Sequence, residues 1–151
     1  MNKLLSKILP ENFKKKIKQN LGVPNMFWSL NNLKNLGFNP GVVIDIGAYQ
    51  GEWTREVYSI FPTSSFLMLE AMPAKTKWLE ETKELNPDKI DFRIQLMGAS
   101  DTEMVIFHEL ETASSVLNEH YETNAKSVQI KLATLDSILH NTQWQKPDMI
   151  K

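Results

Sequence analysis

Two carboxylates and two glycines are the residues of this chain whose types and spacing favour ligand binding. The run 42–46 is short, apolar and rich in β-branched residues, which predicts a strand buried on both faces. Asp45 lies near its end, Gly47 and Gly51 follow at a spacing of four, and a helical pattern begins at Glu52. A strand, a glycine turn and a helix in this order form the opening unit of a nucleotide-binding α/β fold.

The glycines are expected to shape the turn in different ways. Gly47 can adopt a φ angle closed to other residues, and Gly51 allows the backbone to come close to a ligand or a helix. Backbone N–H groups at the start of the helix would face whatever binds above the turn. The other interpretation is an ordinary strand–helix turn in which Asp45 has no ligand role.

The second carboxylate, Glu70, ends the apolar run 65–69, which predicts the second strand. An acidic residue at this place in a nucleoside-binding α/β fold accepts hydrogen bonds from both ribose hydroxyls. Its distance along the chain from Gly47 is close to the roughly 20 residues expected for this partner. The other interpretation of Glu70 is a surface carboxylate at a strand end.

Further elements must position these residues. The pattern predicts helices over 24–36, 52–61, 73–85 and 135–139, and strands over 90–97, 104–110, 127–132 and 147–151. Strand 127–132 is expected to pair with 104–110 as a hairpin insertion, and 147–151 to lie beside 42–46. The expected core contacts of the helices are Phe27, Leu30, Leu33, Leu36, Val57, Ile60, Phe61, Trp78, Leu79 and Leu85. Gly37 and Thr134 are expected to cap helices.

The loop after the third predicted strand would lie beside the adenine of a bound nucleoside. Asp101 could accept a hydrogen bond from the adenine amino group, or the backbone of Gly98 and Ala99 could line the ring. A turn without ligand contact is the alternative for each of these residues.

Composition and charge set bounds on function. A chain of 151 residues has room for one domain with a real core, and a net charge of −1 gives no indication of nucleic-acid binding. The absence of cysteine excludes a disulfide framework and cysteine-ligated metal, and the three histidines have no metal-ligand spacing. No apolar run reaches the ~20 residues of a membrane span, and no secretory signal is recognisable. A cytoplasmic location is therefore expected.

The basic segment 1–21 carries six lysines and one glutamate, with apolar residues at helical spacing. It is expected to be a peripheral helical extension with a solvated lysine face. The alternative is a basic amphipathic segment that makes weak contact with anionic lipid. The expected organisation is therefore an N-terminal helical extension over 1–36 and a ligand-binding domain over 37–151.

The glycine turn does not match the dinucleotide fingerprint G-x-G-x-x-G. Its pattern, Asp45-x-Gly47-x-Tyr49-x-Gly51, resembles motif I of the S-adenosylmethionine (SAM)-dependent methyltransferases, which often read D-x-G-x-G-x-G. A pyrophosphate needs bare backbone around it, whereas SAM has an amino acid end with both charges. The Asp45 carboxylate could attract the SAM ammonium directly or through water.

An ordered set of short motifs makes the resemblance more specific. The motifs are Val43-Ile44-Asp45-Ile46-Gly47-Ala48, Leu69-Glu70-Ala71-Met72-Pro73, Ala99-Ser100-Asp101, Ala113-Ser114-Ser115, Thr134-Leu135-Asp136 and Pro147-Asp148-Met149-Ile150-Lys151. From about Asn31 to Lys151 the chain resembles the FkbM-type methyltransferases. The resemblance implies a Rossmann-like class I fold and methyl transfer from SAM to a hydroxyl on a sugar, glycan or natural product. The SAM-binding residues that it implies are Asp45, Gly47, Ala48, Tyr49, Gly51, Glu70, Ala71, Ala99, Ser100 and Asp101.

Two departures from this family bear on the expectation. Tyr49 stands where the family commonly has Asn, and the family continues beyond the lysine matching Lys151 with an acidic, glycine-containing stretch and more strands. The chain is therefore expected to be an incomplete methyltransferase domain that contains only the first strands of the sheet. It would lack part of the acceptor pocket.

Methyl transfer to a hydroxyl benefits from a base, but the sequence does not identify one. His108, Glu109 and His120 are candidates by residue type only, and each could instead be a surface or structural residue. Two other functions remain open. One is an NAD-type oxidoreductase or epimerase, which the Gly47–Gly51 spacing disfavours, and the other is a non-catalytic SAM-binding remnant.

Overall fold

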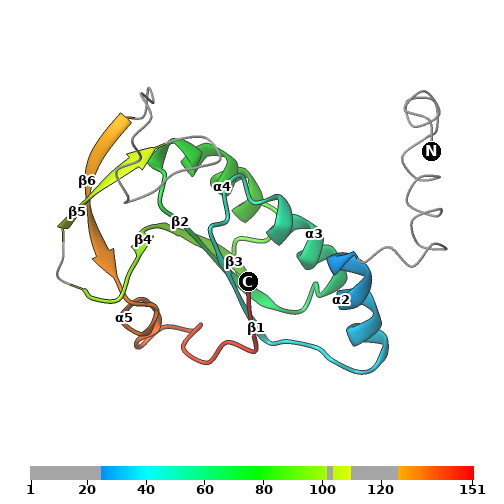
Figure 1. The fold of residues 1–151 in the computed structure, drawn as a ribbon. Coiled ribbons are helices and arrows are strands. Elements are labelled where there is room, and N and C mark those ends of the chain that lie inside the picture. The colour runs from blue at the N-terminus through cyan, green and yellow to red at the C-terminus, as the bar shows by residue number, and fades with distance from the viewer. Residues whose placement is uncertain (1–24, 102–103, 110–125) are drawn as a thin grey trace, which may run out of the picture. The chain divides into compact units, whose positions relative to one another are not determined.

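The computed structural model describes residues 25–101, 104–109 and 126–151 (Figure 1). The chain divides into two units, Met1–Phe38 and Asn39–Lys151, and each is described here by itself. The predictions for segment 1–21, for the motif 113–115 and for His120 lie outside the described residues.

The described part of the first unit is helix α2 (Met26–Asn35). It begins two residues later than the sequence pattern predicted, because the Asn25 side chain caps it by accepting hydrogen bonds from two N–H groups of the first turn. The prediction that Gly37 terminates the helix is confirmed by its φ of 95°. In the apolar stripe Leu30 is buried, while Leu33 and Leu36 are exposed. The prediction that Leu33 and Leu36 are core contacts is therefore wrong, and packing of Leu30 against a sheet stays a prediction.

The second unit is built on a parallel sheet, as predicted. Its strands are β1 (Val42–Ile46), β2 (Ser65–Glu70), β3 (Ile90–Ile94) and β7 (Met149–Ile150). They are arranged in the order β3-β2-β1-β7, and every neighbouring pair is parallel. Nucleotide-binding doubly wound folds have the same arrangement, with the fourth parallel strand on the far side of the first. The predicted Rossmann-like α/β fold is therefore confirmed, with a small sheet.

Helices cover both faces of this sheet (Figure 1). The helices of the second unit are α3 (Glu52–Ile60), η2 (Pro73–Lys75), α4 (Thr76–Lys83) and α5 (Leu135–Leu139). Tyr58 of α3 packs edge-on against Phe66 of β2, with ring centroids 5.8 Å apart, so α3 covers the face that Phe66 occupies. The opposite face forms an apolar cluster with α5 and the segment after it. That cluster contains Ile44, Leu67, Leu69, Ile138, Leu139 and Trp144.

The predicted core contacts of the crossover helices are confirmed in part. Val57, Ile60 and Phe61 of the first crossover helix and its C-cap are buried, and Leu79 of α4 is fully buried. Trp78 and Leu85 were predicted in the core but are 37% and 53% exposed. Trp78 lies about 100° around the helix from Leu79, and Leu85 follows the end of α4 at Lys83.

The predicted strand 90–97 is divided between two sheets. Gln95 interrupts it, because its N–H donates to Glu70 O at 2.7 Å and its side chain then donates to Lys131 O at 2.7 Å. The chain passes into a second sheet of order β4-β6-β5, formed by β4 (Leu96–Met97), β6 (Lys126–Ala133) and β5 (Met104–Glu109). Strands β5 and β6 are antiparallel, which confirms the predicted hairpin pairing, while β4 and β6 are parallel.

Two further predictions of local structure are confirmed. Thr134 caps α5 by accepting a hydrogen bond from Ser137 N–H. Strand β7 pairs with β1 where 147–151 was expected to lie beside 42–46, with Met149 opposite Val43. In the part of the chain that the structure describes, no helix combines the length and apolar character needed to cross a bilayer.

Candidate ligand site at the turn after β1

The turn between β1 and α3 contains three residues with left-handed backbone. Gly47 has a φ of 71°, as predicted for it, while Gly51 and Tyr49 also have positive φ angles, of 76° and 52°. The middle position of the motif thus also needs the conformation that glycine adopts without cost. A side chain in this conformation costs about 1 kcal/mol, so Tyr49 is strained.

The two glycines serve different purposes. A Cβ atom on Gly51 would lie 2.5 Å from Thr82 Oγ1, so this glycine allows α4 to pack against the start of α3. A Cβ atom on Gly47 would have no described atom within 4 Å. Of these two glycines, it is therefore Gly47 that faces space into which a ligand could fit.

Hydrogen bonds within the turn already use most of its N–H groups. Those of Gly47 and Ala48 both donate to Leu69 O, at 2.8 and 3.1 Å, and that of Tyr49 donates to Glu70 Oε2 at 2.7 Å. A dinucleotide fingerprint needs such groups free to bind pyrophosphate. This geometry disfavours the NAD-type alternative, in agreement with the glycine spacing.

The Asp45 carboxylate is completely buried and already has two side-chain partners. The buried Thr54 hydroxyl of α3 donates to Oδ2 at 2.7 Å. The Lys151 ammonium lies 2.9 Å from Oδ1, as an ion pair without the alignment of a hydrogen bond. The contact predicted between Asp45 and a ligand ammonium stays a prediction, and it would have to share this carboxylate with Lys151.

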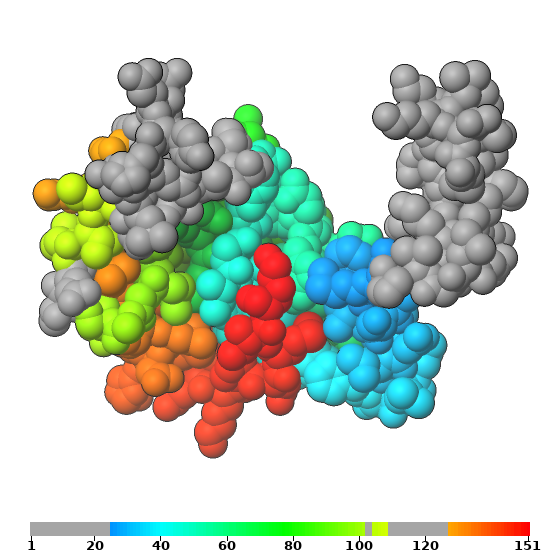
Figure 2. All heavy atoms as spheres, viewed as in Figure 1, coloured from blue at the N-terminus to red at the C-terminus, as the bar shows by residue number. Residues whose placement is uncertain are grey.

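Lys151, which follows β7, contacts this turn, and the sequence interpretation did not name it as a site residue. Its ammonium also donates to Gly47 O at 3.2 Å and lies 5.7 Å from the centre of the Trp53 ring. The C-terminal residues, red in Figure 2, are at the surface in that view. The available signal was a lysine at the end of the strand predicted to lie beside β1, at the edge where parallel strands present their carboxyl ends to ligands.

The Glu70 carboxylate lies on the other side of the same turn. It is 6% exposed, and its oxygens accept from two backbone N–H groups, Tyr49 N to Oε2 at 2.7 Å and Met72 N to Oε1 at 2.9 Å. A carboxylate oxygen has two lone pairs, so each oxygen keeps one for a further donor. Ala71, which lies between Glu70 and Met72 in the sequence, is half-buried. The structure therefore places Glu70 and Ala71 beside the glycine turn, and their contact with a ligand stays a prediction.

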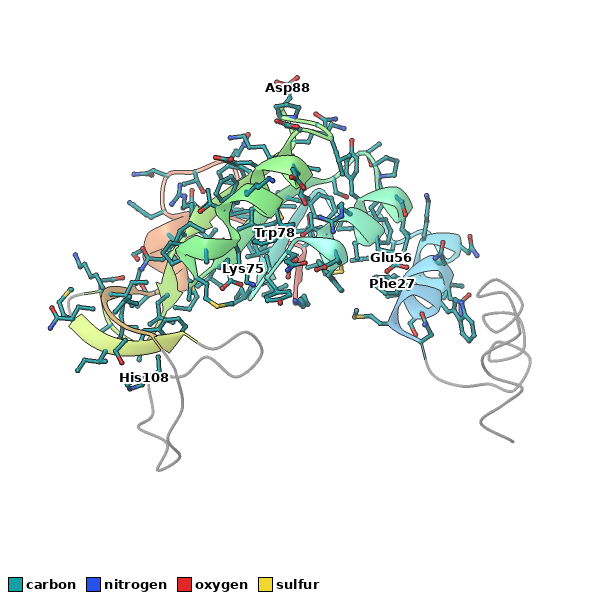
Figure 3. The ribbon with its side chains drawn as sticks, turned by 90° about the horizontal axis from the view of Figure 1, so that it is seen from above. Phe27, Glu56, Lys75, Trp78, Asp88 and His108 are labelled. Carbon is teal, nitrogen blue, oxygen red and sulfur yellow. The ribbon has the colours of Figure 1, made fainter. Side chains whose placement is uncertain are left out.

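The side chain of a buried lysine, Lys75, lies over the ring of Tyr49. The Lys75 ammonium lies 4.2 Å from the centre of the Tyr49 ring and 5.3 Å from that of Trp78, and the residue is 3% exposed. Figure 3 shows Lys75 and Trp78 together over η2 and α4. These cation–π contacts stabilise the Tyr49 ring against α4 and so help to hold the strained turn.

The predicted adenine-side residues follow β4, where Asp101 has a structural role. Its Oδ1 accepts from Thr134 N–H at 2.7 Å and from the Ser137 hydroxyl at 2.6 Å. These hydrogen bonds, that from Ser137 first, lower the pKa of Asp101. Ala99 is exposed, and the Ser100 hydroxyl is buried with no hydrogen-bond partner among the described residues. An adenine contact at these three residues stays a prediction.

The candidate bases do not gather at the turn in the part of the chain that is described. His108 lies on β5, with Nδ1 2.9 Å from Ser127 Oγ, and Figure 3 shows it on the hairpin, away from Lys75 and Trp78. Glu109 ends the same strand. The catalytic residue is therefore not assigned.

A cavity of about 330 Å³ lies elsewhere, on the face of the sheet that α5 covers. It is lined by Leu135, Asp136, Leu139, His140, Gln145, Pro147 and Ile150. Ile150 pairs in register with Ile44, whereas Asp45 points to the opposite face. This cavity is therefore separate from the site at the turn.

No protein-family model matches the chain, and no curated protein matches it. The chain is similar to an O-methyltransferase family protein from Burkholderia thailandensis, with a TM-score of 0.39 and 15% sequence identity. The match covers 53% of this chain and 23% of that structure.

Proposed function

We propose that this chain binds SAM at the turn after β1 and takes part in methyl transfer to a hydroxyl group. The observation that carries the proposal is the position of the Glu70 carboxylate. It is buried at the end of β2, is held 2.7 Å from Tyr49 N and keeps lone pairs free beside the glycine turn. In a sheet of this strand order, a carboxylate at that place binds the ribose of a nucleoside.

The chemistry of the turn suits SAM better than a dinucleotide. SAM brings a ribose for Glu70 but no phosphate, and the N–H groups of Gly47 and Ala48 are already occupied. The open side of Gly47 leaves room for the methionine end of the ligand. The resemblance to the FkbM type supports a sugar or natural-product hydroxyl as the acceptor.

The proposed reaction forms a bond between the acceptor oxygen and the methyl carbon as the carbon–sulfur bond breaks. The electron pair of that bond returns to sulfur, leaving a neutral thioether, and the hydroxyl proton passes to a base. Holding donor and acceptor at near-attack distance supplies most of the rate enhancement in such a transfer. The Gly47–Gly51 turn and Glu70 would orient the donor, and the base remains unassigned.

The test is titration calorimetry of the parent chain and of Glu70→Ala with SAM and with NAD. Loss of hydrogen bonds to a charged group costs about 1.5–3 kcal/mol, so Glu70→Ala should bind SAM at least about tenfold more weakly. Glu81→Ala, which removes an exposed glutamate of α4, should bind like the parent. Urea unfolding of each variant shows that it is folded.

Each outcome separates the alternatives. Parent affinity for SAM in a folded Glu70→Ala variant would remove the ribose assignment. Preference for NAD over SAM would favour the oxidoreductase alternative. Binding of SAM without methylation of any hydroxyl acceptor would favour the non-catalytic one.

A further inference from the structure

We infer that the Lys151 ammonium binds the carboxylate at the methionine end of the donor, and that Asp45 acts by positioning this ammonium. The inference rests on the proposed function. It assigns a ligand-contacting role to Lys151 and changes the predicted role of Asp45 from direct ligand contact to support of Lys151.

The first step is the charge balance at Asp45. Its carboxylate is 0% exposed, and a buried carboxylate is costly unless it is paired. The Thr54 hydroxyl donates a hydrogen bond to Asp45 Oδ2, and the Lys151 ammonium lies 2.9 Å from Oδ1. A ligand ammonium that replaced Lys151 would only exchange one cation for another, and the displaced lysine would lose its ion pair. The arrangement in which Lys151 stays paired with Asp45 is therefore lower in free energy than one in which the ligand ammonium displaces it.

The second step is the geometry of the lysine. Its ammonium has three neighbours, Asp45 Oδ1, Gly47 O at 3.2 Å and the Trp53 ring, whose centre is 5.7 Å away. An ammonium has three donors, so Asp45 and Gly47 leave at least one for a ligand. The side chain is 35% exposed, whereas Asp45 is closed to solvent. The group that a ligand meets on this side of the turn is thus a cation.

The third step is the complement in the ligand. Lys151 follows β7, next to β1, at the crevice where a sheet of this strand order binds ligands. The methionine end of SAM carries one carboxylate and one ammonium. The positive Lys151 attracts the carboxylate and repels the ammonium, which fixes the orientation of the amino acid group. Glu70 holds the ribose on the other side of the turn.

The experiment uses two ligands that differ in one group. SAM has the carboxylate, and decarboxylated SAM lacks it but retains the sulfonium and the amine. Lys151→Met should weaken SAM binding about tenfold, the loss of a hydrogen bond to a charged group, and leave binding of decarboxylated SAM within about threefold of the parent. Lys151→Arg keeps the charge and should retain most of the affinity for SAM.

A double variant distinguishes a loss of ligand binding from a loss of folding. Lys151→Met leaves Asp45 buried without its cation, whereas Asp45→Asn combined with Lys151→Met removes both charges together. This double variant should also lose discrimination between the two ligands. Glu70→Ala is the matched control, because it should weaken both ligands to a similar extent.

The outcomes separate this inference from the proposed function. Equal weakening of both ligands by Lys151→Met, or no change in either, would overturn the role of Lys151. Tighter SAM binding by that variant would also overturn it, because it would show that Lys151 competes with the ligand ammonium at Asp45. If the parent bound neither ligand, the proposed function itself would fail, and this inference with it.

Discussion

Asp45 and Glu70 are buried carboxylates on neighbouring parallel strands, yet they are held in different ways. Asp45 is paired with the Lys151 ammonium and the Thr54 hydroxyl, so its charge is balanced inside the protein. Glu70 accepts from the peptide N–H groups of Tyr49 and Met72, which carry no net charge. The two carboxylates beside this glycine turn therefore differ in whether a cation neutralises their charge.

The difference shows that burial of a carboxylate does not by itself identify a ligand contact. A carboxylate neutralised by a lysine contributes mainly to the structure, and here it presents that lysine to the turn. A carboxylate held only by dipoles retains both its charge and free lone pairs for a polar ligand. We therefore expect changes at Asp45 to affect folding most and changes at Glu70 to affect binding most.

The largest expected effect on stability comes from Asp45→Ala. Removing one partner of a buried ion pair and the acceptor of the Thr54 hydroxyl should lower the free energy of unfolding by about 3 kcal/mol. Asp91→Ala is the matched control, because the Lys83–Asp91 pair has a similar distance of 2.7 Å but side-chain exposures of 39% and 35%. Its loss should cost less than about 1 kcal/mol. Equal effects of the two variants in urea unfolding would contradict the distinction.

Substitution of Gly51 in the turn should have a smaller effect on the free energy of unfolding. Gly51→Ala combines a left-handed backbone with a Cβ 2.5 Å from Thr82 Oγ1, an atom that accepts from Arg55 Nη1 at 2.6 Å and donates to Trp78 O at 2.9 Å. We expect a loss of about 2–3 kcal/mol in the free energy of unfolding.

Gly47→Ala is the counterpart of that variant. It should lower the free energy of unfolding by about 1 kcal/mol through backbone strain alone, because no described atom lies within 4 Å of the added Cβ. Gly47→Val should reduce SAM affinity more than stability, as calorimetry and urea unfolding together would show. A Gly47→Val variant that bound SAM like the parent would disprove the assignment of the turn to the ligand.

The smallest effect concerns Asp101, a third carboxylate, which is on the surface. Hydrogen bonds from Ser137 and Thr134 lower its pKa below the ordinary value of 3.8. A lowered pKa in the folded state means that the stabilisation is fully present above pH 3.8 and is lost as the pH falls through the folded value. Asp101→Asn should therefore reduce the acid dependence of the melting temperature below about pH 4. An unchanged acid profile would show that these hydrogen bonds do not lower the pKa of Asp101 in the folded state.

The sequence by itself determined the elements that depend on local pattern. The apolar run of β1, the positive φ of Gly47, the place of Glu70 at the end of β2 and the cap at Thr134 were all predicted correctly. Periodicity and glycine conformation act over a few residues, so the order of residues alone reveals them.

Only the tertiary structure decided which distant groups meet. Lys151 follows Asp45 by more than 100 positions, and their ion pair forms because β7 lies beside β1 in the sheet. The Asp101 carboxylate accepts a hydrogen bond from Ser137 of α5, and the predicted strand 90–97 is divided between two sheets at Gln95. The partner of a polar group depends on strand order and register, which arise from packing of the whole chain and are not encoded in any single stretch of it.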